Sequence, residues 1–342
     1  MNERDAVRTE LLNRNEVVYH ETVFLRFLAM LLIVNSHVKF IHPVGAIATG
    51  GMVGNSIFFL LSTYGLFLSA QRDKLNLITW YARRLLRLYP SIWIILTFVV
   101  VPYSFHNQAY ALALYHNNFG ELLQLYFLPR DPFWFLEALI IFYIPTYFVI
   151  KYFTKKLLLS LLAISAVLYF GVYFTMLDLY SFSIEEYPFK LIFYWSVMLF
   201  GVYLGSNSDN ITYDGLKDVL CLALFAAGIY IHKYFMQQSY YSSYQYVEHL
   251  LAFPMLYCLM KISKSPFIRK TLFSWPLANK GITFVGNSTL ELYVTHVSLI
   301  PLFVECRIDY PLNIVLFIAV SLLLTYVVKN VSKRLHSFIC RA

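Results

Sequence analysis

Charged residues are scarce in this chain. Asp, Glu, Lys and Arg together make up 13% of its 342 residues, about half of the share found in soluble domains. Hydrophobic residues make up 59%. Apolar runs long enough to cross a membrane recur from end to end, separated by polar segments too short to fold alone. These features exclude an ordinary soluble domain and predict an all-α, polytopic membrane domain.

Motifs of soluble-type chemistry are also missing. The chain has no glycine-rich phosphate loop, Gly-x-Ser-x-Gly elbow or His-Glu-x-x-His motif, which disfavours soluble-type nucleotide and hydrolase sites. Its four cysteines lie far apart without Cys-x-x-Cys or Cys/His spacing, so we expect neither a metal site nor a disulfide framework. The first 20 residues lack the plan of a removable signal peptide. We therefore expect the first span to act as its own insertion signal.

Ten apolar runs have the length of a membrane-spanning helix. They cover residues 24–41, 52–70, 89–105, 133–150, 157–177, 189–205, 216–235, 246–262, 284–304 and 311–328. If the N-terminus is cytoplasmic, the inner segments hold 21 of the 27 lysines and arginines, the outer segments hold four, and Arg26 and Lys39 lie within the first span. This alternation predicts that both termini are cytoplasmic. It also accounts for the net charge of +8 without a nucleic-acid partner.

Two of the connecting segments are themselves partly apolar. The inner segment before the third span predicts an interfacial helix, with its arginines toward phosphate or water and Pro90 opening the span. The residues expected toward lipid are Trp80, Tyr81, Leu85 and Leu88. The outer segment 104–132 is expected to lie along or dip into the membrane surface. The expected division of the chain is a cytoplasmic segment at 1–20, a transmembrane domain at 21–330 and a cytoplasmic tail at 331–342.

Two ionisable residues lie within the first apolar run, in the stretch FLRFLAMLLIVNSHVKFI. Arg26 and His37 are eleven residues apart, so on an α-helix they share a face and stand about 16 Å apart along its axis. Ionisable groups inside a span are costly and normally face a polar cavity or a partner. Taken singly, Arg26 is explained as well by a snorkelling anchor, and His37 by a core histidine bonded to another helix. The shared face favours a functional site.

This stretch and four later ones resemble, in the same order, the motifs of the acyltransferase 3 family of integral membrane acyltransferases. In that family an arginine and a histidine with ten residues between them lie in the first span. The similar stretches are FLRFLAMLLIVNSH (24–37), GGMVGNSIFFLLSTYGLFLS (50–69), YARRLLRLYP (81–90), FWFLEALIIFYIPTY (133–147) and VGNSTLELYVTH (285–296). With its ten spans, the resemblance covers nearly the whole chain.

The chain departs from the family pattern at three points. Thr63 and Tyr64 stand where the family has a Ser-Gly pair, and Gly65 is displaced, which is compatible with a shifted close contact between helices. Glu137 follows Trp134 by three positions rather than five or six, so we do not assign it the role of the family's acid. The longer relatives carry a hydrolase-like soluble domain after the last span, and this sequence does not.

The resemblance implies an enzyme that transfers an acyl group, usually acetyl from acetyl-CoA, to a hydroxyl of a cell-surface glycan or its lipid-linked precursor. Arg26 would hold the extended donor, whose thioester reaches toward His37, and a neutral imidazole there would take the proton of the attacking hydroxyl. Arg83, Arg84 and Arg87 have the three- and four-residue offsets that let side chains converge on a donor phosphate. A topogenic cluster beside anionic lipid explains these three arginines equally well.

Several other residues are candidates near the expected site. His296 should lie at a depth comparable to that of His37, with Tyr293 one turn earlier, and would orient the acceptor or help to stabilise an oxyanion. A structural hydrogen bond explains His296 nearly as well. Glu137 and Glu291 are membrane-embedded carboxylates that would orient an imidazole, bind substrate or, when protonated, bridge helices.

Three residues near span ends have weaker interpretations. Trp134 is a sugar-stacking candidate, although such a residue more often belongs to an interfacial aromatic belt. Glu248 and His249 lie near the end of a span, and we expect them at the membrane interface.

The leading hypothesis is an O-acetyltransferase of a surface polysaccharide in the inner (plasma) membrane of a bacterium, with acyl-CoA, a glycan acceptor, membrane lipids and polysaccharide assembly proteins as its expected partners. One rival is a transporter or flippase of a small or lipid-linked substrate, with Arg26 and His37 as its substrate or proton site. Another is a non-catalytic membrane component of a polysaccharide assembly complex. The sequence alone leaves these alternatives open.

Overall fold

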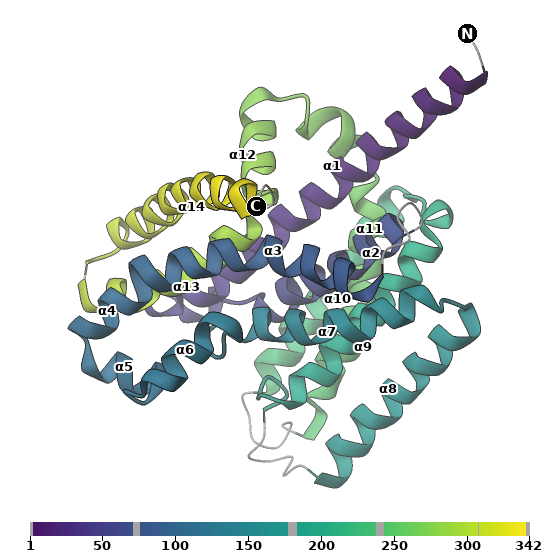
Figure 1. The fold of residues 1–342 in the computed structure, drawn as a ribbon. Coiled ribbons are helices and arrows are strands. Elements are labelled where there is room, and N and C mark those ends of the chain that lie inside the picture. Colours follow the sequence, from purple (N-terminus) through teal and green to yellow (C-terminus); the bar gives the residue numbers. More distant parts are fainter. Residues whose placement is uncertain (1–2, 71–75, 177–182, 237–242, 307, 340–342) are drawn as a thin grey trace. The chain divides into compact units, whose positions relative to one another are not determined.

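A computed structural model describes residues 3–70, 76–176, 183–236, 243–306 and 308–339 (Figure 1). Every regular element within these ranges is a helix, so the all-α prediction is confirmed. The main helices are α1 (Glu3–His37), α2 (Gly51–Ala70), α3 (Leu77–Ile95), α4 (Val101–His106), α5 (Gln108–Tyr115), α6 (Phe119–Phe127), α7 (Trp134–Lys151), α8 (Lys155–Met176), α9 (Phe189–Ser206), α10 (Leu216–Met236), α11 (Tyr246–Ser263), α12 (Pro276–Gly286), α13 (Thr289–Cys306) and α14 (Leu312–Ile339). The shorter helical turns are η1 (Val38–Phe40), η2 (Gly45–Ile47), η3 (Leu96–Val100), η4 (Ser208–Asn210) and η6 (Phe267–Leu272).

Nine helices within the described residues are long and apolar enough to cross a membrane, and each overlaps one of the ten predicted spans. The remaining predicted span, 246–262, is also a helix, the 18-residue α11. Glu248, His249 and Lys261 make α11 less apolar. The polytopic helical bundle expected from the apolar runs is therefore confirmed.

α3 and α14 extend beyond their predicted spans, as does α1, which begins at Glu3. α3 begins at Leu77, where the side-chain oxygen of Asn76 accepts a hydrogen bond from the backbone N–H of Thr79 at 2.8 Å. It passes through Pro90 without a break, so the predictions of a separate interfacial helix and of a span opened by Pro90 are wrong. A proline is tolerated inside a membrane helix where neighbouring groups satisfy the freed carbonyl. α14 continues to Ile339, inside the predicted tail.

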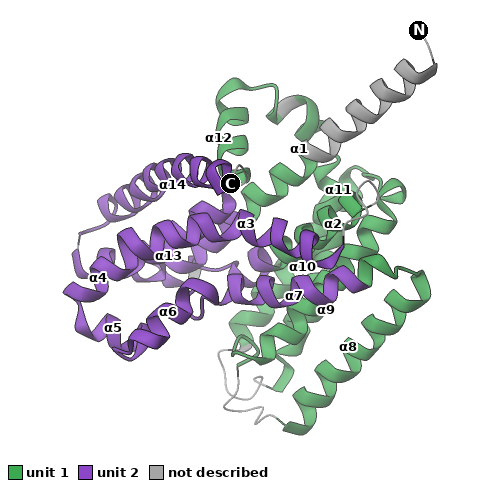
Figure 2. Cartoon of the chain, in the orientation of Figure 1, with its two compact units in different colours: residues 1–29, 56–73, 149–287 green, residues 30–55, 74–148, 288–342 purple. Residues whose placement is uncertain are grey.

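The chain divides into two compact units (Figure 2). Unit 1 consists of residues 1–29, 56–73 and 149–287, and unit 2 of residues 30–55, 74–148 and 288–342. Unit 1 therefore holds the first part of α1, most of α2, and α8 to α12. Unit 2 holds the end of α1, α3 to α6, most of α7, and α13 with α14.

In unit 1 a close contact joins α2 to α9. The hydroxyl of Thr63 donates to the carbonyl of Met198 at 2.7 Å, and a Cβ added to Gly201 would lie 2.4 Å from the carbonyl oxygen of Leu60. Only glycine allows this approach, because any side chain would push the two backbones apart. Gly65 has no described atom within 4 Å of an added Cβ. The close contact between helices is therefore made at Thr63 and Gly201, and not at Gly65, the displaced glycine of the family pattern.

In unit 2, α3, α13 and α14 pack against one another, and the end of α1 is held against α13 and α14. Val38 and Ile41, which follow α1, join Leu299 and Phe317 in a buried apolar cluster. The side-chain amide of Asn313 donates to the carbonyl of Ile41 at 3.0 Å. These contacts determine where α1 ends and therefore where its last residue lies.

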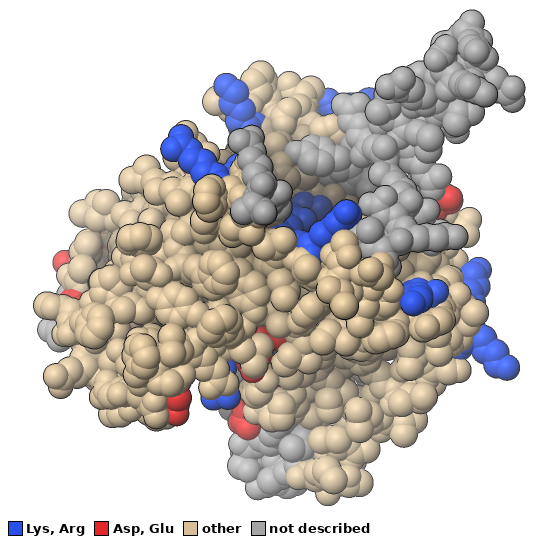
Figure 3. Space-filling model, viewed as in Figure 1, with Lys and Arg blue, Asp and Glu red and all other residues tan. Residues whose placement is uncertain are grey.

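Uncharged residues dominate the surface seen in Figure 3, on which Lys and Arg form isolated groups. Large apolar side chains are exposed along several of the spans. They include Leu159, Ile164, Val167, Leu168 and Phe174 on α8, Leu220, Leu224 and Ile231 on α10, and Val315, Ile318 and Leu323 on α14. Soluble proteins rarely expose so much contiguous apolar surface, whereas lipid-facing helices do.

The α2–α9 contact predicts a steric effect at Gly201. Gly201→Val should lower the free energy of unfolding by about 1–3 kcal/mol, because its side chain has no space between the helices. Thermal unfolding in detergent measures this change as a lower midpoint. Gly65→Ala is the matched control, and it should leave the midpoint unchanged or raise it, since alanine favours a helix by about 1 kcal/mol over glycine. Equal midpoints for the two variants would contradict the prediction.

Candidate active site

Two histidines from opposite ends of the chain meet in unit 2. His37 is the last residue of α1, and its Nδ1 lies 2.9 Å from Nε2 of His296 on α13. The two rings stack with 5.2 Å between centroids and 22° between planes. His296 is fully buried, whereas His37 is partly exposed. The contact fits the comparable depth that the sequence predicts for these two residues.

The loop that follows α1 holds the helix end in place. The side-chain amide of Asn35 donates to two carbonyls of the segment leading to α2, at 2.8 and 2.9 Å. A Cβ added to Gly51, the first residue of α2, would lie 2.6 Å from the hydroxyl oxygen of Ser36. The backbone therefore turns back closely beside His37, which restricts the orientations open to its ring.

The hydrogen-bond partners assign the tautomer of each ring. Nδ1 of His296 lies 2.7 Å from the carbonyl oxygen of Leu292, and because a carbonyl can only accept, this nitrogen carries the proton. In the neutral ring, Nε2 of His296 is then an acceptor, and it receives the Nδ1–H of His37. Nε2 of His37 is left unprotonated, as a general base requires.

Tyr293 supports the buried ring of His296. Its ring lies edge-on to that of His296, with 5.8 Å between centroids, and packs against Phe135 of α7 at 5.3 Å. Its hydroxyl donates to the carbonyl of Pro132 at 3.3 Å. With only 3% of its surface exposed, Tyr293 makes the contacts of a residue that positions His296.

A polar network lies at the start of α13, one to two turns before His296. Glu291 accepts a hydrogen bond from Ser91 of α3 at 3.3 Å, and Lys329 of α14 donates to Ser288 at 2.6 Å. The ammonium of Lys329 also lies within electrostatic range of the Glu291 carboxylate. The sequence did not point to Ser91, Ser288 or Lys329. An isolated serine forms no recognisable motif, and Lys329 entered the sequence analysis only as one of the lysines and arginines expected on the cytoplasmic side.

The arginines of α3 differ in their surroundings. Arg84 is partly buried, with its guanidinium 5.2 Å from the centroid of the Trp80 ring, whereas Arg83 and Arg87 are exposed. Trp80 and Leu88 are 4% and 6% exposed, and Trp80 packs edge-on against two tyrosines of α7. The expectation that these two residues face lipid is therefore wrong, because the tryptophan instead supports a cation.

Arg26 lies on the same unbroken helix as His37. Because α1 runs from Glu3 to His37 without interruption, the eleven-residue offset keeps both residues on one side of the helix. Arg26 is partly buried, and its guanidinium donates to the Thr22 hydroxyl at 3.2 Å. Arg26 belongs to unit 1 and His37 to unit 2.

Trp134 and Glu137 lie in the first turn of α7. Trp134 is partly buried, and its ring is edge-on to that of Phe135 at 6.3 Å between centroids. Glu137 is 8% exposed. From this turn it is Phe135, the neighbour of Trp134, that reaches Tyr293 and through it the ring of His296.

Glu248 and His249 lie in the first turn of α11, and both side chains are buried. In unit 1 the His249 ring stacks on Phe193 with 3.7 Å between centroids, and its Nδ1 lies 2.8 Å from the Tyr169 hydroxyl. Glu248 faces His232 of α10, with 3.4 Å between Oε1 and Nδ1. These polar groups tolerate burial because each meets a partner on a neighbouring helix. Their nearness to a helix end did not reveal which face they occupy.

The arrangement in unit 2 is suited to acid–base chemistry. A neutral imidazole with a bare Nε2, backed by a second histidine, can take a proton from a hydroxyl and return it. The exposed side chains of Arg83 and Arg87 add positive charge to the same unit. Within the described ranges, no group of three His, Cys, Asp or Glu side chains is placed to hold a metal ion.

Comparison with known protein families gives a match over most of the chain. The acyltransferase 3 family, described as an acyltransferase domain, matches residues 23–329. No curated protein and no solved structure matches the chain. All five stretches that resemble the family motifs lie within the matched residues.

The tautomer assignment is directly testable. In protein labelled with ¹⁵N-histidine, both His37 and His296 should carry their proton on Nδ1 and none on Nε2 at neutral pH. The carbonyl of Leu292 can only accept, so Nδ1 of His296 must hold a proton, and Nε2 of His296 must then accept from Nδ1 of His37. Nitrogen chemical shifts from solid-state NMR distinguish the two forms, and the single variants His37→Gln and His296→Gln assign the signals. A proton on Nε2 of His37 would contradict the assignment.

Proposed function

Because this chain belongs to the acyltransferase 3 family of integral membrane acyltransferases, we propose that it transfers the acetyl group of acetyl-CoA to a hydroxyl of a cell-surface polysaccharide or its lipid-linked precursor. The observation that carries this proposal is the hydrogen bond between His37 and His296. Attack of a hydroxyl on a thioester needs a base to remove the hydroxyl proton. An oriented imidazole with one bare nitrogen supplies that base.

His37 is the general base of the proposed reaction. Its Nε2 takes the proton of the acceptor hydroxyl while the hydroxyl oxygen forms a bond to the thioester carbon. The tetrahedral intermediate then collapses as the carbon–sulfur bond breaks, and the departing thiolate takes the proton from Nε2 of His37. The products are the acetyl ester of the acceptor and CoA with a free thiol, and His37 is again neutral.

His296 positions His37 and stabilises its charged form. The lone pair on Nε2 of His296 accepts the Nδ1–H of His37, so the positive charge that develops during attack forms beside an acceptor. The Nδ1–H of His296 is engaged by the carbonyl of Leu292. These contacts favour orientation of the base over direct stabilisation of an oxyanion, which would need an N–H donor.

The donor is proposed to bind through arginines. Acyl-CoA is cytoplasmic and carries several phosphates, and the exposed Arg83 and Arg87 have the four-residue offset that suits one phosphate group. Arg84 is held in place by the Trp80 ring. Arg26, on the same side of α1 as His37, is proposed to bind the donor nearer its thioester.

The acceptor is proposed to be a saccharide whose hydroxyl reaches Nε2 of His37. Trp134 offers an aromatic surface for a sugar ring, and Glu137 and Glu291 are the carboxylates proposed for sugar hydroxyls. Tyr293 acts on the acceptor only through His296. The proposed location is the inner membrane of a bacterium, where polysaccharide assembly proteins are the expected neighbours.

Replacing the base should abolish transfer. His37→Ala should lower kcat by about 10²–10⁴-fold, the usual contribution of a general base, while membrane insertion is retained. Purified protein, ¹⁴C-acetyl-CoA and surface glycan deacylated by mild base provide the assay, with label in the glycan as the readout. Unchanged turnover would remove His37 from the mechanism. If the wild-type protein moves glycan across vesicles without transferring label, the flippase reading is favoured.

If His296 acts as a hydrogen-bond acceptor for His37, two substitutions of His296 should differ in activity. The amide oxygen of His296→Gln can still accept a hydrogen bond from Nδ1 of His37, so kcat should fall by about tenfold or less. The His296→Leu variant leaves the Nδ1–H of His37 without an acceptor. Its kcat should fall nearly to that of the His37→Ala variant. Both variants are compared in the same transfer assay, after thermal unfolding shows that each is folded. Equal activities would mean that the hydrogen bond has no part in catalysis.

A further inference from the structure

The segment between α11 and α13 joins two of the predicted spans without crossing the membrane itself. It holds the turn η6 and α12, and the 11 residues of α12 extend over about 16 Å, roughly half of the hydrocarbon core. Residues 264–288 carry four lysines and arginines and no Asp or Glu. This charge predicts that the segment lies at the cytoplasmic surface of the membrane.

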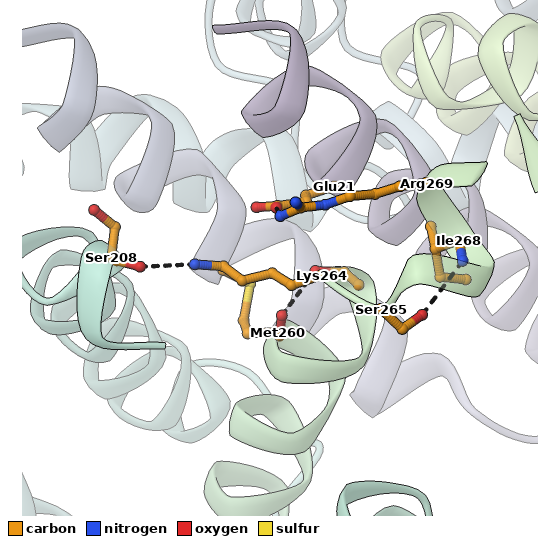
Figure 4. Close-up of polar contacts among 8 residues, drawn as sticks. Glu21, Ser208, Met260, Lys264, Ser265, Ile268 and Arg269 are labelled. Carbon is orange, nitrogen blue, oxygen red and sulfur yellow. Dashed lines mark hydrogen bonds and ion pairs between the residues drawn. The ribbon is translucent and has the colours of Figure 1, made fainter. Parts of the chain in front are cut away.

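One side of this segment is fixed to α1. Val23 of α1 joins Ile268 of η6 and Ile282 of α12 in a buried apolar cluster. The carboxylate of Glu21, also on α1, is paired with the guanidinium of Arg269, which follows Ile268 in η6 (Figure 4). Both η6 and α12 are therefore held against α1, which determines the side that each of them leaves uncovered.

The uncovered side exposes large apolar residues. Phe267 of η6 is 61% exposed, although its neighbour Ile268 is buried. Trp275 and Leu277, at the start of α12, are 63% and 86% exposed. Leu277 lies five residues before the buried Ile282, a rotation of about 140° around α12, so it points away from the contact with α1. Three large apolar side chains so close in the sequence predict contact with an apolar medium or partner.

Two lysines accompany these apolar side chains. Lys270 and Lys280 are exposed, and neither makes a hydrogen bond or ion pair within the ranges that the structure describes. Lys280 follows Leu277 by three residues and is therefore its neighbour on the surface of α12. Exposed apolar residues beside lysines are typical of a helix that lies in the membrane interface, where a tryptophan sits at the level of the headgroups.

We propose that an interfacial patch of unit 1 binds the anionic phospholipids of the cytoplasmic leaflet. The patch consists of Phe267, Lys270, Trp275, Leu277 and Lys280. Its three apolar side chains insert between the lipids, and its two lysines bind the lipid phosphates. Charge complementarity selects this occupant, because the cytoplasmic leaflet is negatively charged and residues 264–288 include no acid. The patch is then an in-plane anchor that fixes the neighbouring part of α1 at the membrane surface, whatever reaction the protein catalyses.

The test measures which lipid lies beside Trp275. Its fluorescence is recorded in full-length protein whose other four tryptophans are replaced by phenylalanine. The vesicles contain phosphatidylcholine and phosphatidylglycerol, one of them brominated in its acyl chains. We expect both brominated lipids to quench Trp275, with phosphatidylglycerol enriched there by about fivefold or more, because one lysine near a membrane surface favours anionic lipid by about that factor. If the single-tryptophan protein does not fold, the difference between wild type and Trp275→Phe gives the same ratio.

Neutral substitutions separate the role of the lysines from that of the apolar side chains. Lys270→Gln combined with Lys280→Gln should bring the enrichment of phosphatidylglycerol close to one, while both lipids still quench Trp275 because its apolar contact remains. The matched control is another pair of exposed lysines in unit 1, Lys155 and Lys156 at the start of α8. Replacing both of these by glutamine should leave the enrichment at Trp275 unchanged.

Three other outcomes would each overturn the inference. If neither brominated lipid quenches Trp275, water or another protein covers the patch. If both lipids quench it equally in the protein with its lysines intact, the patch does not select anionic lipid. If the enrichment falls as much in the control pair as in the Lys270 and Lys280 variant, the net charge of the protein attracts the lipid and the patch does not. No part of this test uses acyl transfer, so failure of the proposed function would leave its result unchanged.

Discussion

A hydrogen bond between two imidazole rings inside a helical membrane domain is the interaction on which the chemistry proposed for this protein depends. In a region of low dielectric constant, an unpaired ring nitrogen is costly and a paired one is strongly oriented. The carbonyl of Leu292 sets the direction of the whole chain of donors, since it can only accept. The proton on His296 follows from that carbonyl, and the bare nitrogen of His37 follows from His296.

The same rule governs the other polar groups of the interior. Thr63 meets a carbonyl of α9, His249 meets Tyr169, and Glu21 meets Arg269. In each case the partner comes from a helix or turn far away in the sequence, so these bonds specify which helices are neighbours while apolar packing fills the space between them. Polar residues in this bundle therefore carry much of the information on helix pairing, although they are few.

Much of the fold could be predicted from the sequence, because the length of each apolar run shows where a helix can cross a membrane. The helix that carries Arg26 and His37 was predictable for the same reason. The partner of His37 was not, since His296 lies 259 residues away and no periodicity connects them. Local rules also failed where tertiary contacts prevailed. Pro90 does not interrupt α3, and Trp80, which was predicted to face lipid, is buried.

Because α1 is unbroken, the number of residues between two positions on it matters as much as the identity of the residues. Glu21 and His37 are sixteen residues apart on one unbroken helix, a separation of about 24 Å along its axis. Inside a regular helix no loop is present to absorb a change of length. One inserted or deleted residue in this interval would turn the two ends relative to each other by about 100°. An insertion or deletion between Arg26 and His37 would therefore take these two residues off the side of α1 that they share.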